Sequence, residues 1–286
     1  MAPRAHSPSP VPIAVNFHLY KPCNYRCRFC FATYRDIDGH LPLPDALRLL
    51  QQLREAGCEK LNFAGGEPTL HPHIGELVAE AKRLGFVTTL ITNGARLGRL
   101  LDEHAREIDW VGLSVDSGDE DVQARLGRGR GGHVARSRAL AARVHALGLG
   151  LKLNTVVTAL NWQEDMRVLL RELRPARWKV FQVLAIAGQN DGDVEPLLLA
   201  REQFHSFVER HRELDAEGLG PVAEDNDAMT DSYAMIDPLG RFYGNHGGRY
   251  VYSRPILEAG VITALAEVDF EVQRLVARGG LYPWRR

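Results

Sequence analysis

Short apolar runs alternate with helically spaced apolar residues along the first two thirds of the chain. The runs with strand character are 11–19, 60–64, 86–92, 110–116, 149–158 and 178–185, and the helical spacings are 43–56, 74–84, 134–147 and 201–213. Near-continuous apolar strands separated by helices are typical of a parallel sheet that is covered on its faces. The pattern therefore predicts an α/β fold made of six βα units.

The chain changes character after residue 187. A polar stretch, 188–195, leads into one helix and then into a tail rich in Gly, Tyr and Asn. Because no linker or internal repeat is visible, we expect residues 11–187 to form a barrel and residues 188–286 to cap its mouth within the same structural unit. Residues 1–10 are rich in Pro and Ser and lack the apolar core of a signal peptide, which predicts a disordered lead-in.

The bulk composition argues against several classes of function. The formal net charge of the 286 residues is −1, which gives no electrostatic case for direct binding to nucleic acid or to an anionic membrane. The sequence contains no apolar segment long enough to span a bilayer. Three of the four cysteines are clustered, as expected in a reducing compartment and not in a disulfide scaffold. We therefore expect a cytoplasmic, monomeric protein.

The clustered cysteines, Cys23, Cys27 and Cys30, follow the spacing C-x3-C-x2-C. Three thiolates at this spacing can hold three irons of a [4Fe-4S] cluster, and the fourth iron would stay open to a small molecule. A zinc knuckle is the alternative, with His18 or His40 completing a set of four ligands. Aromatic side chains that would shield a cluster from water favour the first interpretation; they are Tyr25, Phe29 and Phe31.

Lysine is rare in this sequence, with five of the 35 basic residues. Lys152 and Lys179 nevertheless interrupt predicted strand interiors, where a cation is costly to bury without an anion. Two cations that point into one cavity suit a triphosphate, whose oxygens accept charge-assisted hydrogen bonds. The alternative is that each lysine pairs with a buried carboxylate such as Asp116, or extends to the rim of the barrel.

The cysteine motif and the stretch Gly65-Gly66-Glu67-Pro68 together resemble the radical S-adenosylmethionine (SAM) enzymes. This resemblance implies a partial (β/α)6 TIM-like barrel, a [4Fe-4S] cluster, and SAM bound to the open iron. Active-site groups of such barrels lie at the C-terminal ends of the strands, where the cysteines, Asn93 and Asp116 are also predicted. Members that modify peptides or make the molybdenum cofactor carry further C-terminal cysteines, and this chain has none after Cys58.

Within that superfamily the chain is similar to the viperins, which are nucleotide dehydratases. The matching stretches are 15–18, 23–31, 59–68, 113–117, 127–129, 152–154, 164–166, 177–182, 231–233, 247–249 and 278–280. Animal viperins begin with an amphipathic helix that anchors them to a membrane, and residues 1–10 cannot form such a helix. The resemblance therefore implies a soluble, prokaryotic type of viperin.

The resemblance also implies roles for individual residues. Cys23, Cys27 and Cys30 would hold the cluster, and SAM would contact Phe29, Gly65, Gly66, Glu67, Asn93, Ser114 and Arg128. The substrate would contact Asn16, His18, Lys60, Lys152, Arg177 and Lys179, and Tyr233 would relay a proton or a hydrogen atom near the ribose. Alternatively, Arg128 belongs to a solvated loop and Glu67 to an ordinary strand-to-helix turn. Cys58, His71, His73 and the tryptophans are expected to be structural.

The implied reaction converts CTP, or else UTP or GTP, to its 3′-deoxy-3′,4′-didehydro analogue, a terminator of viral RNA synthesis in antiviral (anti-phage) defence. A 5′-deoxyadenosyl radical abstracts the C4′ hydrogen and the 3′-hydroxyl is lost as water, so the enzyme is expected to be a carbon-oxygen lyase. A one-electron donor of flavodoxin or ferredoxin type is implied as a partner. Two alternatives stay open: another radical SAM enzyme that acts on a peptide or a cofactor precursor, and a non-catalytic iron-sulfur protein.

Overall fold

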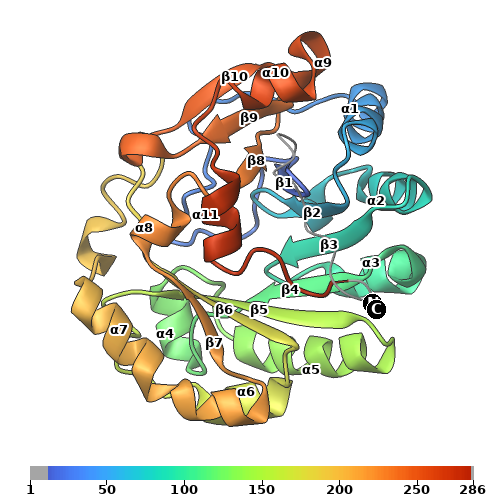
Figure 1. Cartoon of the computed structure of the whole chain (residues 1–286). Helices are drawn as coiled ribbons and strands as arrows, with labels where there is room; N and C mark the ends of the chain where they lie inside the picture. The colour runs from blue at the N-terminus through green and yellow to red at the C-terminus, as the bar shows by residue number, and fades with distance from the viewer. Residues whose placement is uncertain (1–11, 285–286) are drawn as a thin grey trace.

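The strands form one curved sheet that carries helices on its outer side (Figure 1). The computed structural model describes residues 12–284, so the expectation for residues 1–10 lies outside the described residues. The strand order in the sheet is β10-β9-β8-β1-β2-β3-β4-β5-β6-β7. The strands are β1 (Ala14–His18), β2 (Lys60–Ala64), β3 (Val87–Thr92), β4 (Trp110–Ser114), β5 (Gly150–Val157), β6 (Arg177–Gln182), β7 (Pro221–Glu224), β8 (Ala234–Ile236), β9 (Arg241–Gly244) and β10 (Val251–Pro255).

The first six strands are parallel neighbours, as the alternation of strands and helices predicted. The α-helices are α1 (Leu43–Glu55), α2 (Ile74–Arg83), α3 (Leu97–His104), α4 (Glu120–Arg125), α5 (His133–Ala146), α6 (Arg167–Leu173), α7 (Arg201–Arg210), α8 (Asn226–Met229), α9 (Ile256–Ala259), α10 (Val261–Leu265) and α11 (Val272–Ala277). The shorter helices, among them α3 and α6 with 8 and 7 residues, were not predicted because such short segments show too little periodicity.

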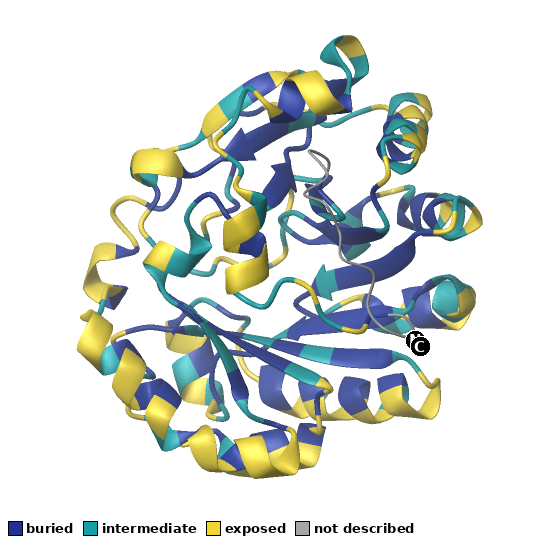
Figure 2. Cartoon of the chain, in the orientation of Figure 1, coloured by how far each residue is buried: buried dark blue, intermediate teal, exposed yellow. Residues whose placement is uncertain are grey.

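Successive residues of the strands face opposite sides of the sheet. Phe17 and Phe63 point outward into the main hydrophobic core, where they pack with leucines of α1 such as Leu49. Their neighbours Asn16 and Asn62 line a pocket on the inner side. Figure 2 shows the result: the sheet and the inner faces of the helices are buried, and the outer faces of the helices are exposed. The curved sheet therefore encloses a polar lumen inside an apolar shell.

The segment after residue 187, which we expected to cap the barrel mouth, extends the sheet on both sides of the six-stranded part. It adds β7 in parallel beside β6 and β8 in parallel beside β1, and then the antiparallel strands β9 and β10. Between the described strands, β7 and β8 share no hydrogen-bonded ladder, so the barrel stays open there. A hydrogen bond from the Tyr233 hydroxyl to Glu224 crosses this gap. The sequence analysis missed these strands because each is only three to five residues long.

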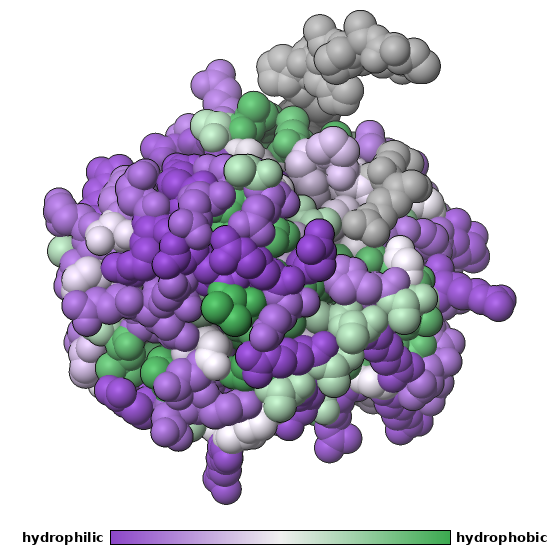
Figure 3. Space-filling view, turned by 90° about the horizontal axis from the view of Figure 1, so that it is seen from below, coloured by the Kyte–Doolittle hydropathy of each residue, from purple (hydrophilic) through white to green (hydrophobic). Residues whose placement is uncertain are grey.

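The outer surface is predominantly hydrophilic on the side shown in Figure 3, with small scattered hydrophobic patches. Among residues 12–284, no helix has both the length and the apolar composition needed to cross a bilayer.

Candidate active site

The three clustered cysteines lie on an irregular loop between β1 and α1, at the C-terminal end of β1. Backbone N–H groups of Arg26 and Arg28 donate to the carbonyls of Gly127 and Leu126, at 3.2 and 3.0 Å. The sulfur of Cys23 accepts a contact of 3.4 Å from the Tyr25 N–H and one of 3.8 Å from the Asn93 side-chain amide. The loop is thus fixed by backbone hydrogen bonds, with N–H donors directed at a sulfur.

The surroundings of the thiols fit an iron-sulfur cluster. Burial raises the pKa of Cys27 to about 12 and that of Cys30 to about 11, while the charge of Arg128 opposes both shifts. Iron binding would therefore release protons from thiols that are neutral in the free protein. Hydrogen bonds to sulfur and a nearby cation are the features by which a protein tunes such a cluster. Within residues 12–284, no three His, Cys, Asp or Glu side chains are grouped as for a single metal ion.

The stretch Gly65-Gly66-Glu67 turns directly against this loop. A Cβ on Gly66 would lie 2.2 Å from the carbonyl oxygen of Lys21, so only glycine allows the two backbones to approach this closely. Glu67 is buried, and its carboxylate accepts hydrogen bonds from Thr69, Thr92 and the Asn93 N–H. The buried carboxylate of Glu67 thus holds Asn93 beside the cysteine loop.

Arg128 is buried and ion-paired with Asp116, so the alternative of a solvated loop is wrong for its side chain. Burial disfavours its charge, but Asp116 outweighs burial and raises the pKa of Arg128. Its guanidinium lies 5.5 Å from the centre of the Phe29 ring, and its charge lowers the pKa of Cys27. Ser114 ends β4 two residues before Asp116. Arg128 and Phe29, two of the predicted SAM-binding residues, are therefore close to the cysteines.

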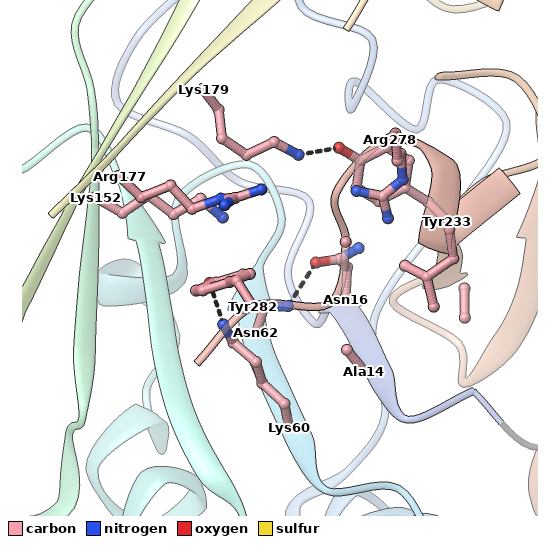
Figure 4. Close-up of a pocket in the computed structure, with 13 residues that line it drawn as sticks. Ala14, Asn16, Lys60, Asn62, Lys152, Arg177, Lys179, Tyr233, Arg278 and Tyr282 are labelled. Carbon is pink, nitrogen blue, oxygen red and sulfur yellow. Dashed lines mark hydrogen bonds between the residues drawn. The ribbon is translucent and has the colours of Figure 1, made fainter. Parts of the chain in front are cut away.

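A second group of predicted residues lines a pocket inside the barrel (Figure 4). Five cationic side chains surround it: Lys60, Lys152, Arg177, Lys179 and Arg278. Lys60 and Arg177 are the first residues of β2 and β6, so this cation pocket lies at the N-terminal ends of the strands. The cysteine loop lies at the opposite, C-terminal ends. The lumen therefore has a cysteine end and a cationic end.

The cations of the pocket are poorly neutralised by the protein itself. Among the described residues, Glu224 is the only carboxylate paired with them, through Lys179 and Arg278. Burial lowers the pKa of Lys60 to about 6 and that of Lys152 to about 8, and neighbouring cations add to both shifts. Burial also lowers the pKa of Lys179 despite the contact with Glu224. Such a site favours an anionic ligand, which would restore the charged form of each lysine.

Glu224, Arg278 and Tyr282 are pocket residues that the sequence analysis did not assign. The carboxylate of Glu224 is fully buried, and Lys179 and Arg278 hold its pKa below the ordinary value even though burial opposes them. Lys60 donates to the Tyr282 hydroxyl, and the Arg177 guanidinium lies 4.2 Å from the centre of the Tyr282 ring. Arg278 lies in the stretch 278–280 that is similar to the viperins, and this was the one signal in the sequence that could have identified it. Contacts between residues so distant in the sequence leave no local pattern.

Tyr233 lies in the cation pocket, and its hydroxyl contacts Lys179 at 2.5 Å. It immediately precedes β8, whose first residue, Ala234, is in register with Val15 near the start of β1. Tyr233 is therefore at the cationic end of the lumen, not at the cysteine end.

Asn16 and His18 lie between the two ends, along β1. Asn16 accepts a hydrogen bond of 2.9 Å from Asn62, whose own side-chain oxygen has no partner among the described residues. His18 is buried, which lowers its pKa to about 3, and its Nδ1 also lacks a partner in the described part of the chain. Neutral hydrogen-bonding groups thus connect the cysteine end with the cation pocket.

Comparison with known proteins identifies the family. The profile of the radical SAM superfamily matches residues 19–173. A protein of Flammeovirga pacifica called S-adenosylmethionine-dependent nucleotide dehydratase is 40% identical over 95% of this chain and 96% of its own length. A protein of the same description from Lacinutrix mariniflava is 39% identical over 98% of this chain, which spans 60% of that relative. One from a Thermoplasmatales archaeon is 34% identical and matched over 96% of its length.

Solved structures agree on the fold. Streptococcus suis SuiB bound to S-adenosylmethionine has a TM-score of 0.68 over 88% of this chain and 65% of SuiB, at 18% identity. Native anSMEcpe with bound AdoMet has a TM-score of 0.60 over 82% of this chain and 74% of the anSMEcpe chain, at 15% identity. These likenesses confirm the predicted α/β radical SAM fold, and the sequence relatives narrow the assignment. The chain belongs to the radical SAM superfamily and, within it, to the viperin family of S-adenosylmethionine-dependent nucleotide dehydratases.

Proposed function

We propose that this protein dehydrates a ribonucleoside triphosphate, CTP or the related UTP or GTP, to its 3′-deoxy-3′,4′-didehydro analogue. The observation that carries the proposal is the cation pocket, where five cationic side chains meet one paired carboxylate in a lumen that leads to the cysteine loop. A triphosphate supplies several negative charges in a row and accepts charge-assisted hydrogen bonds from Lys and Arg.

At the cysteine end, Cys23, Cys27 and Cys30 would hold a [4Fe-4S] cluster, with SAM on its open iron. When bound and reduced, the cluster and SAM would supply the 5′-deoxyadenosyl radical that accepts the C4′ hydrogen of the substrate. Phe29, Gly65, Gly66, Glu67, Asn93, Ser114 and Arg128 would form the SAM site. Gly66 permits the close backbone approach, Asn93 reaches the cysteine loop, and the ion pair with Asp116 fixes the position of the Arg128 guanidinium beside the thiols.

At the cationic end, Lys60, Lys152, Arg177 and Lys179 would bind the triphosphate together with Arg278. Tyr233 contacts Lys179 and Glu224 in this pocket, and its hydroxyl would relay a proton or a hydrogen atom near the ribose of the bound nucleotide. Asn16, Asn62 and His18 would position the sugar between the two ends, since their unpartnered polar atoms are buried in the lumen.

The dehydration removes one hydrogen atom from C4′ and the hydroxyl group from C3′. The hydroxyl leaves as water, so the second step consumes one proton and one further electron, and the product carries a C3′=C4′ double bond. The lumen is buried, which keeps bulk water away from the substrate radical. A nucleotide that lacks the 3′-hydroxyl cannot be extended, so the product would terminate viral RNA synthesis in defence against phage.

The test is an anaerobic assay of the reconstituted enzyme with SAM, dithionite and each of the four ribonucleoside triphosphates. We expect formation of 5′-deoxyadenosine that depends on one preferred triphosphate, together with a nucleotide product lighter by one water in mass spectrometry. Formation of 5′-deoxyadenosine at the same rate with and without every triphosphate, and no dehydrated nucleotide, would contradict the proposal.

A further inference from the structure

Five arginines around the cysteine loop lack a carboxylate partner in the part of the chain that the structure describes. Arg26, Arg28, Arg125, Arg130 and Arg136 form no ion pair with any residue between 12 and 284. Arginines elsewhere on the surface commonly form ion pairs. Examples are Arg48 with Asp45 at 3.1 Å, Arg138 with Glu172 at 2.7 Å and Arg201 with Asp225 at 2.7 Å. Because the net charge of the whole chain is −1, these five cysteine-loop arginines are a local concentration of positive charge.

The five arginines come together because two loops are in backbone contact. Beyond the hydrogen bonds of Arg26 and Arg28 to Gly127 and Leu126, a Cβ on Gly127 would lie 2.0 Å from the carbonyl oxygen of Arg26. Arg125 and Arg130 lie just before and just after this contact in the chain, and both are exposed. Arg136 donates to the Tyr25 hydroxyl at 2.9 Å, which brings the start of α5 to the same place.

Acidic residues of the same segment are engaged elsewhere. The Asp119 carboxylate accepts from the N–H groups of Asp121 and Val122 and caps α4. The Glu120 carboxylate accepts from three N–H groups at the start of α5, those of His133, Val134 and Ala135. Asp121 is the remaining acidic residue, and it is exposed. These three carboxylates form no ion pair with the cysteine-loop arginines among the described residues, and five arginines against three carboxylates leave a local surplus of two positive charges for a partner.

We propose that the cysteine-loop arginines are the docking surface for a small acidic protein that carries single electrons on a flavin or an iron-sulfur group. The proposal rests on the radical SAM chemistry of the family, in which the cluster must gain an electron that the carrier loses. Arg26 and Arg28 flank Cys27 in the chain, so a carrier docked on them lies next to a thiol of the cluster. Opposite charges steer such encounters, and electron-transfer interfaces are small and short-lived.

The test is stopped-flow reduction of the reconstituted cluster by an acidic flavodoxin in its fully reduced state, followed by visible absorbance without nucleotide. We expect the double variant Arg26→Glu/Arg130→Glu to lower the second-order rate constant at least tenfold at low ionic strength. Added salt should slow the wild type and change the variant little, because the attraction is screened. Reduction by dithionite, and SAM cleavage driven by dithionite, should be equal in both proteins.

The matched control is Arg106→Glu, because Arg106 is also exposed and unpaired among the described residues but is remote in sequence from both loops. An unchanged rate constant in the double variant would overturn the proposal. So would a control variant whose rate constant falls by the same factor per reversed charge. If the double variant fails to hold the cluster, Arg125→Glu/Arg130→Glu repeats the test with the cysteine loop intact. Binding of single-stranded RNA to the arginines without binding of flavodoxin would also refute it. Because no nucleotide is present, failure here is distinct from failure of the dehydratase proposal.

Discussion

Replacing Lys60 with methionine should make the nucleotide-free protein more stable and its nucleotide complex weaker. Lys60 is 2% exposed, and its ammonium group lies near Lys152, Arg177 and Lys179 without a paired carboxylate in the described chain. Burial and these neighbours lower its pKa from 10.5 to about 6. Folding at neutral pH therefore forces this side chain to give up a proton that it keeps in the unfolded chain.

The magnitude follows from the pKa shift. At pH 7.5 the unfolded lysine is charged and the folded one is neutral, so the cost is three pKa units, or roughly 4 kcal/mol at 1.36 kcal/mol per unit. Methionine removes this cost but also loses the hydrogen bond to Tyr282, worth about 1 kcal/mol. The net gain is on the order of 3 kcal/mol, which should raise the melting temperature by roughly 6 °C.

The pH dependence has a definite sign. Because the folded pKa is depressed, the cost grows as pH falls from 10.5 toward about 6 and is constant below that value. The difference in melting temperature between variant and wild type should thus be larger at pH 6.5 than at pH 9. Bound CTP should raise the wild-type pKa again, so calorimetry in buffers of different ionisation enthalpy should show proton uptake that Lys60→Met lowers.

The assay is thermal unfolding with and without CTP, with Lys82→Met as control. Lys82 lies on the surface and pairs with Asp109 at 2.6 Å. Its replacement should therefore change neither the melting temperature nor the rise of the melting temperature with CTP by more than about one or two degrees. If Lys60→Met proved less stable than wild type at every pH and kept the full stabilisation by CTP, the reasoning about the cation pocket would be refuted.

Three further predictions concern single side chains. Cys27→Ala should abolish both iron binding and SAM cleavage, measured by iron content and by 5′-deoxyadenosine formation; retention of a full cluster would contradict the ligand assignment. Lys179→Ala should leave the cluster intact and raise the nucleotide KM at least tenfold; an unchanged KM would remove this lysine from the triphosphate site. Asp116→Asn should leave Arg128 charged and buried without its partner, at a cost of about 3 kcal/mol in urea unfolding; a cost below about 1 kcal/mol would show that the pair is unimportant for stability.

The parts of the fold that local patterns encode were predictable. The strand runs around Phe17, Phe63 and Leu113 predicted the parallel sheet because each has an apolar outer face and is followed by a helix. Cys23, Cys27 and Cys30 could be assigned because all three ligands lie in one loop. Lys152 and Lys179 were visible because a cation is unexpected in a strand interior.

The remaining parts depend on contacts between segments that are far apart in the sequence. Glu224 meets Lys179 across the edge of the sheet, and Tyr282 meets Lys60 over 222 residues. The lysines were predicted to face one cavity, yet the position of that cavity at the N-terminal ends of the strands could not be read from spacing. The pairing of β7 with β6 and of β8 with β1 could likewise not be predicted, because the pairing partners of short strands leave no periodic signal in the sequence.

The decisive measurement for the C4′ radical reaction is the transfer of deuterium from the substrate to 5′-deoxyadenosine. CTP carrying deuterium at C4′ would be incubated anaerobically with the reconstituted enzyme, SAM and dithionite, and 5′-deoxyadenosine would be analysed by mass spectrometry. If another triphosphate is preferred, its C4′-labelled form takes the place of CTP. We predict one deuterium in 5′-deoxyadenosine and a dehydrated nucleotide without deuterium. Unlabelled 5′-deoxyadenosine, with the deuterium still in the nucleotide, would contradict a lumen that brings C4′ to the cysteine end while the cation pocket holds the triphosphate.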